Sequence, residues 1–292
     1  MKGTAQHILS VKNKPYGFLT ILLTSIMLFT GCEDVVEVEV NNISPRLVVE
    51  ADIEWEKGED ASNQSITLST STDFFDGSFL PVNNADVSIT KLDTDEVIPF
   101  TLAGNGVYAT TNFIAELGSP YQLTINYDGE DFVGYETFVL VPEVNRVVQD
   151  VALGFEGEDV VSIDFFADDV ANMDNFFLLT HAVNGDPTPF LSVWDDNFQN
   201  GNELRFFYRD YFDDDQEVVV AGDEIAIEFM GISESYYDFM FLLTEQAYSG
   251  GDPFDTTPVQ LKGNVTNMSN PDQDAFGFFR LSEKVSFTVV VQ

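Results

Sequence analysis

The stretch YQLTINYDGEDFVGY (residues 121–135) contains two runs of alternating apolar and polar residues on either side of Asp128-Gly129. Alternation with a period of two predicts a β-strand with one buried face, and an Asp-Gly pair between two such runs predicts a tight hairpin. A second hairpin signal, Gly104-Asn105-Gly106, precedes the short run Val107–Ala109. The middle of the chain is therefore predicted to form antiparallel β-structure.

The same pattern extends in both directions along the chain. Short strands are predicted at residues 46–51, 65–72, 85–89, 151–155, 160–166, 176–183, 204–208, 217–220, 224–230 and 285–291. Strands of this length separated by turn residues are typical of an immunoglobulin-like β-sandwich. We expect a mostly β protein, with one such sandwich over residues 32–141. A second β-rich domain, sandwich or barrel-like, is expected over residues 142–292, and Pro142 should stiffen the connection between the two.

One helix is predicted near residues 234–249. Its apolar positions follow three- and four-residue steps, at Tyr236, Phe239, Met240, Leu243 and Ala247. Ser233 or Ser235 can cap its first turn, and Gly250-Gly251 can end it. A single apolar stripe of this kind favours a helix that packs over a sheet.

The N-terminal segment predicts a lipoprotein signal. Lys2, Lys12 and Lys14 precede an apolar run from about residue 18 to residue 29, which is short for a membrane span. Gly31 follows, and then Cys32, which is the only cysteine of the chain. We predict that residues 1–31 are a signal peptide and that Cys32 carries a lipid. The alternative is an ordinary signal peptide followed by an unpaired cysteine.

The charge balance excludes several classes of partner. The 292 residues include 12 Lys and Arg against 50 Asp and Glu, which gives a formal net charge of −38. Such acidity argues against binding to nucleic acid and against direct docking on anionic lipid, apart from a covalent anchor. A hydrophobic content of 44% is enough for a substantial core.

The sequence offers no compact catalytic set, and we predict no catalytic residues and no required cofactor. Beyond the signal peptide the only histidine is His181, which lies in an apolar run and indicates a structural role. A single imidazole cannot build a histidine-based metal site, and no serine lies in a Gly-x-Ser-x-Gly motif. The many acidic residues leave one alternative open, a carboxylate-dependent glycan hydrolase.

Two further features have alternative interpretations. Asp213, Asp214 and Asp215 could hold Ca²⁺ through hard oxygen ligands, which would suit a Ca²⁺-dependent structural or adhesive module, or they could form a solvated turn. Aromatic residues in turn-like contexts could form a docking surface or fold back over the ends of the sandwich. They are Phe74, Phe75, Phe79, Phe198 and Phe212.

Several short motifs, in order along the chain, resemble a family of Bacteroidota outer-membrane lipoproteins, the domain-of-unknown-function family 4249. The motifs are Cys32-Glu33-Asp34, residues 46–50 (RLVVE), 85–89 (ADVSI), 106–108 (GVY), 118–123 (GSPYQL), 263–267 (GNVTN) and 276–279 (FGFF). The chain departs from the family pattern at Ala51, where glycine is usual, and at residue 142, where a proline-rich step is reduced to one proline.

The resemblance implies a lipoprotein that works beside a SusC-like TonB-dependent transporter as its accessory subunit. Glu33 and Asp34 occupy the positions of an export signal that directs such lipoproteins to the outer face of the outer membrane. The family has no established catalytic residues. We therefore expect a binding or lid-like subunit of a nutrient uptake complex, with a ligand and a stoichiometry that the sequence does not predict.

Overall fold

The computed structural model describes residues 45–72, 79–154, 157, 159–170, 173–197, 199, 201–209, 218–248 and 259–292. These residues belong to one compact unit that ends at Gln292. The unit is mostly β, with a single α-helix among the described residues, and its sheets pack as sandwiches. The predicted fold class is therefore confirmed.

The described residues before 140 form eight strands. They are β1 (Leu47–Glu56), β2 (Gln64–Thr70), β3 (Leu80–Pro81), β4 (Asp86–Lys91), β5 (Glu96–Gly104), β6 (Val107–Thr110), β7 (Pro120–Tyr127) and β8 (Glu130–Thr137). The predicted hairpin is the β7–β8 pair, in which Asp128 and Gly129 have φ angles of 52° and 80°. Positive φ at both central residues is what a two-residue hairpin turn requires, and it explains the Asp-Gly pair.

The described residues after 140 add eight strands and one helix. The strands are β9 (Val144–Leu153), β10 (Asp159–Asp168), β11 (Phe176–Val183), β12 (Phe190–Asp195), β13 (Glu203–Arg209), β14 (Glu224–Ile232), β15 (Val265–Asn267) and β16 (Phe276–Val290), with a 3₁₀ turn η1 (Pro271–Gln273). The predicted strand at 217–220 is wrong for the part that is described, because residues 218–220 form no strand. Strands β3, β5, β12 and β15 are additions that the sequence pattern did not predict.

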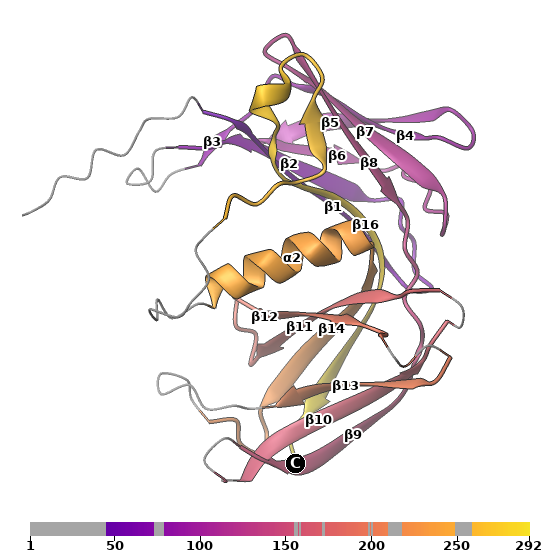
Figure 1. Ribbon diagram of the computed structural model, residues 1–292, viewed down its shortest axis with the longest axis vertical. Helices are drawn as coiled ribbons and strands as arrows, with labels where there is room; N and C mark the ends of the chain where they lie inside the picture. Colours follow the sequence, from indigo (N-terminus) through magenta and orange to yellow (C-terminus); the bar gives the residue numbers. More distant parts are fainter. Residues whose placement is uncertain are drawn as a thin grey trace, which may run out of the picture. The chain divides into compact units, whose positions relative to one another are not determined.

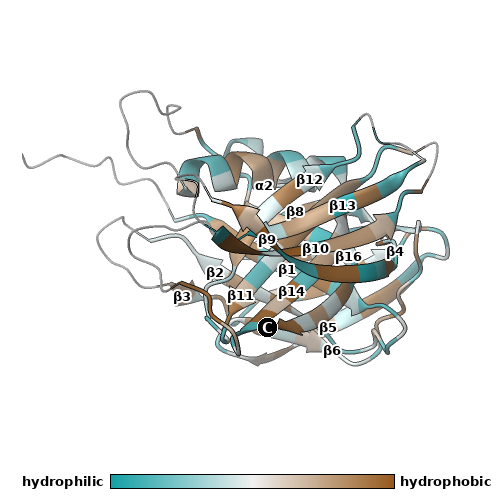
Figure 2. Cartoon of the chain, turned by 90° about the horizontal axis from the view of Figure 1, so that it is seen from below, coloured by the Kyte–Doolittle hydropathy of each residue, from teal (hydrophilic) through white to brown (hydrophobic). Residues whose placement is uncertain are grey.

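The predicted helix is confirmed as α2 (Glu234–Ala247). The hydroxyl of Ser233 accepts a hydrogen bond from the backbone N–H of Tyr236, so Ser233 is the cap. Tyr236 and Met240 bury one face of α2 against residues of β11, β12 and β14. Figure 1 shows α2 beside these strands. Figure 2 shows hydrophilic and hydrophobic stretches alternating along α2, as expected for a helix with one packed face.

The strands form two sheets. The larger has the order β12-β11-β14-β16-β1-β2-β6-β5-β4-β7-β8-β15, with β3 beside β2, and the smaller has the order β13-β10-β9. In the first sandwich, β4, β7 and β8 pack against β1, β2 and β6 around residues such as Ile53, Leu68 and Leu123. In the second, the β13-β10-β9 sheet packs against β11, β14 and β16 around Phe165, Phe177 and Phe229.

Strand β16 belongs to both cores. Its residues Phe279 and Leu281 lie in the first core, and Phe287 and Val289 pack against the second. It pairs in parallel with β1 and antiparallel with β14. The predicted domain boundary after residue 141 stays a prediction, but the packing shows that the end of the chain returns to the first core.

Candidate functional site

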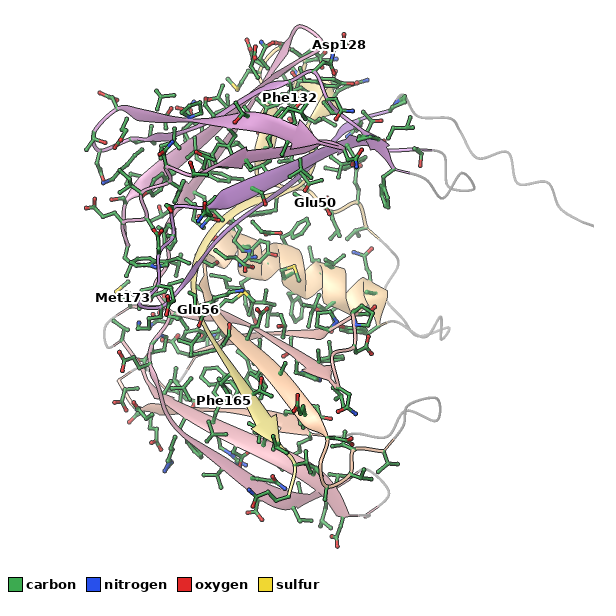
Figure 3. The ribbon with its side chains drawn as sticks, turned by 180° about the vertical axis from the view of Figure 1, so that it is seen from behind. Glu50, Glu56, Asp128, Phe132, Phe165 and Met173 are labelled. Carbon is green, nitrogen blue, oxygen red and sulfur yellow. The ribbon has the colours of Figure 1, made fainter. Side chains whose placement is uncertain are left out.

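Strand β1 presents four acidic side chains, Glu50, Asp52, Glu54 and Glu56, on the face opposite the first core. Alternate residues of a strand point to the same side, at a spacing of roughly 7 Å. Figure 3 labels Glu50 and Glu56, which mark the two ends of this acidic row. An acidic row of this kind needs cationic partners wherever other segments cover it.

Strand β16 supplies those partners, Arg280 and Lys284. The guanidinium of Arg280 donates from Nε to Oδ1 of Asp52 at 2.9 Å and from Nη2 to Oε1 of Glu54 at 2.6 Å. The ammonium of Lys284 donates to Oε2 of Glu54 at 2.8 Å and to Oε1 of Glu228 at 2.9 Å. We call these five residues the ion-pair network; it joins β1, β16 and β14.

Arg280 is the most deeply covered member of the network, with a side chain that is 5% exposed. The ring centroid of Tyr236 on α2 lies 5.2 Å from its guanidinium carbon, and the sulfur of Met230 accepts from Nη1 at 3.3 Å. Burial alone would lower the pKa of Arg280, but the charges of Asp52 and Glu54 outweigh burial and raise it. Burial raises the pKa of Tyr236 to about 12.

The network holds the carboxylate of Glu54 ionised. Burial alone would raise the pKa of Glu54, but the charge of Arg280 and the hydrogen bonds from Lys284 and Arg280 together lower it. A general acid needs the opposite shift, because it must keep its proton near neutral pH. The geometry therefore suits fixed charges that join three strands, rather than proton transfer at Glu54.

Glu136, at the end of β8, is a carboxyl group whose pKa is raised, and burial is the main cause. It accepts hydrogen bonds from the backbone N–H of Thr137 at 2.9 Å and from the hydroxyl of Ser233 at 2.8 Å. Since Ser233 is the cap of α2, these contacts fasten the start of the helix to the first sandwich. A glycan hydrolase needs two acids about 5–10 Å apart, and that alternative stays a hypothesis.

A shallow hollow of about 330 Å³ adjoins the network. Strands β11, β14 and β16 and the turn after β11 surround it, and its polar lining consists of Thr180, Asp186, Glu228, Ser286 and Thr288. Glu228 belongs to both the hollow and the ion-pair network. Hydroxyl and carboxylate groups that line a hollow can hydrogen-bond a small polar ligand.

A family described as a domain of unknown function (DUF4249) matches residues 33–288 of the chain. The chain belongs to the DUF4249 family. The match spans every described strand and helix except the last two residues of β16. The ion-pair network and the hollow thus both lie within the family domain.

Two solved structures are similar to this DUF4249 chain. A DUF4785 family protein from Legionella pneumophila is 14% identical, with a TM-score of 0.25, and the match covers 63% of this chain and 51% of that one. The chain thus spans about half the length of the Legionella protein. A segment of two fibronectin type III domains from chicken tenascin is 9% identical, with a TM-score of 0.23, and the match covers 84% and 98% of the two chains. No curated protein matches the chain.

Most site residues predicted from the sequence lie outside the described part of this DUF4249 chain. These are Cys32, Glu33 and Asp34, the group Asp213, Asp214 and Asp215, and the aromatic residues Phe74, Phe75, Phe198 and Phe212. Within the described residues, no group of three or more His, Cys, Asp or Glu side chains could hold a metal ion. In the same residues, no helix has the length and apolar character that a bilayer crossing requires.

Two of the residues singled out in the sequence are described. His181 lies with its ring centroid 5.0 Å from that of Phe190 and 4.6 Å from that of Tyr208, and burial lowers its pKa to about 4. Phe79 is 79% exposed, so its ring does not fold back over the sandwich.

The sequence pattern did not predict the ion-pair network of this DUF4249 chain. The acidic alternation at residues 50–56 was visible in the sequence. Its partners Arg280 and Lys284 are more than 220 positions away, and only the parallel pairing of β1 with β16 brings them together.

Proposed function

We propose that the chain is a lipid-anchored outer-membrane protein that faces the cell exterior and serves a SusC-like TonB-dependent transporter as an accessory subunit, with a binding or lid-like role in nutrient uptake. The observation that carries the proposal is Cys32, which follows a short apolar run and Gly31. The family match begins at residue 33, immediately after this cysteine. This start supports a mature domain whose first residue is Cys32.

The anchor supplies a physical reason for such a role. A subunit tied to the membrane beside its partner has a high effective concentration, so it needs little intrinsic affinity to remain associated. The acidic pair Glu33 and Asp34 supports export to the outer face, as in the lipoproteins that the chain resembles. The hollow beside the ion-pair network is where we would place a small ligand.

The test is purification of the full chain from its native membrane after mild detergent extraction. We expect a large TonB-dependent transporter to copurify, and mass spectrometry to find a diacylglyceryl group on Cys32 as the first residue. A Cys32→Ser variant is the matched control, because it removes the anchor and leaves the folded domain unchanged; it should be recovered without the transporter. A wild-type chain recovered alone, or one with an unmodified sulfur, would overturn the proposal.

A further inference from the structure

Strand β9 is an edge strand of unusual exposure. It forms one edge of the β13-β10-β9 sheet, and among the described residues no strand pairs with its outer edge. Four of its ten residues are large apolar side chains with exposed fractions of 40% (Val147), 41% (Val148), 63% (Val151) and 72% (Leu153). A long apolar edge without proline or lysine is a template for pairing with another strand.

The two charged residues of β9 make it complementary to itself. Arg146 and Asp150 are four residues apart, and both lie on the face that Val148 shares, opposite Phe166, Ser162 and Asp164 of β10. If a second β9 runs antiparallel with Val148 opposite its own copy, each Arg146 lies opposite the Asp150 of the other strand. Opposite charges across a strand pair stabilise it, and like charges destabilise it.

The backbone geometry agrees with this register. The N–H of Val151 donates to Oδ1 of Asp150 at 2.8 Å rather than to β10, so odd-numbered residues of β9 turn their amides to the open edge. In an antiparallel pair, Val147 and Gln149 would then exchange ladder hydrogen bonds across the new edge. Residues 146, 148 and 150 would occupy the non-hydrogen-bonded positions, where facing side chains are closest.

We propose that two copies of the chain associate through antiparallel β9 strands, with a two-fold axis at Val148 and reciprocal ion pairs between Arg146 and Asp150. The two small sheets thereby become one six-stranded sheet. A two-fold contact of this kind uses the same surface on both copies and closes without forming a fibre. The inference does not rest on the proposed function, because it uses only residues 144–153.

Among the features of the single chain that oppose pairing, two are weak. Arg146 already contacts Glu203 at 2.7 Å, but both side chains are nearly half exposed, and exposed pairs of this kind exchange partners at little cost. The net charge of −38 repels a second copy, but at physiological ionic strength screening limits that repulsion to a range of about 8 Å.

The first experiment is oxidative cross-linking of the full chain in its membrane or in detergent. A Val148→Cys variant places two thiols across the two-fold axis, at about the separation a disulfide requires. A Val97→Cys variant is the matched control, because Val97 is 59% exposed on β5 of the first sandwich, where it pairs with Thr90 of β4. We expect a disulfide-linked dimer for Val148→Cys alone, and none for the wild type, whose only cysteine is Cys32. Equal cross-linking of both variants would overturn the proposal.

The second experiment tests the register by exchanging charges. The Asp150→Arg and Arg146→Asp variants each place like charges opposite each other, so each alone should associate about tenfold more weakly than the wild type. Mixed together, they restore both opposite-charge pairs, and a heterodimer should form with near wild-type affinity in sedimentation experiments. If each variant associates as the wild type does, or if mixing restores nothing, this pairing of β9 is wrong.

Discussion

At the scale of single residues, two buried ionisable groups, Arg280 and His181, differ in their charge. Arg280 stays charged under α2 because Asp52 and Glu54 accept its hydrogen bonds. His181 lies against Phe190 and Tyr208, and burial keeps it neutral. The sequence indicated the structural role of His181 from its apolar surroundings. It could not indicate the partners of Arg280, because those partners lie on a strand at the other end of the chain.

The lowered pKa of His181 predicts a pH dependence of stability. In the unfolded chain His181 should titrate near 6.5, and in the folded chain near 4. Below pH 6.5 the unfolded state therefore binds one more proton, and the free energy of unfolding falls until the pH reaches about 4. Relative to a His181→Leu variant, we expect a loss of up to about 1.4 kcal/mol per pH unit in this range.

Urea unfolding of both proteins at a series of pH values measures this difference. Carboxylates titrate in both proteins, so their contribution cancels in the comparison. Above pH 6.5 the difference between the two free energies of unfolding should be constant. If the curves of unfolding free energy against pH stayed parallel for the two proteins below pH 6.5, the fold would not exclude a proton from His181.

At the scale of elements, the parallel pairing of β1 with β16 depends on a close backbone contact. Gly277 has a φ of +87°, and a Cβ atom at this position would overlap the carbonyl oxygen of Val49. The sequence predicted a strand at 285–291, but β16 begins at Phe276 and is twice as long. The first half of β16 lacks a simple alternation of apolar and polar residues, because its side chains are covered on both faces of the sheet.

Gly277 provides a prediction with a matched control. Gly58 has a similar φ of +84°, but no heavy atom lies within 4 Å of the position a Cβ would take. A Gly58→Ala change should therefore cost only the backbone strain, about 1 kcal/mol. A Gly277→Ala change adds the overlap with β1 and should cost at least about 3 kcal/mol. If urea unfolding showed the same loss in the free energy of unfolding for both variants, β1 and β16 would separate without cost at Gly277.

At the scale of the whole described unit, two sandwich cores share one strand. Leu281 and Phe287 of β16 lie only six residues apart but pack in different cores. Between them, the carboxylate of Glu283 accepts hydrogen bonds from Lys57 at 3.0 Å and from the backbone N–H of Val141 at 3.0 Å. Neither core can lose β16 without exposing apolar surface of the other, so we expect the two to unfold together.

The two tryptophans make this cooperativity measurable. Trp55 packs against the first core, with its ring centroid 6.0 Å from that of Phe138, and Trp194 packs against the second, 5.7 Å from Phe206. The Trp55→Phe and Trp194→Phe variants each retain one fluorescent reporter. In urea, we expect the fluorescence transition of each variant to coincide with the circular dichroism transition of the same variant. Separate transitions would instead support two independent domains.

The sequence by itself determined many of the strands, the β7–β8 turn and the capped helix α2, because each depends on residues within a few positions of one another. Alternation, an Asp-Gly pair and a serine cap act locally, so they are visible without the fold. The tertiary structure alone decided that β16 serves two cores and that Arg280 and Lys284 meet the acidic row of β1. It also decided that no other described strand pairs with the outer edge of β9. These features depend on which distant segments become neighbours, and burial of apolar surface over the whole unit selects those neighbours.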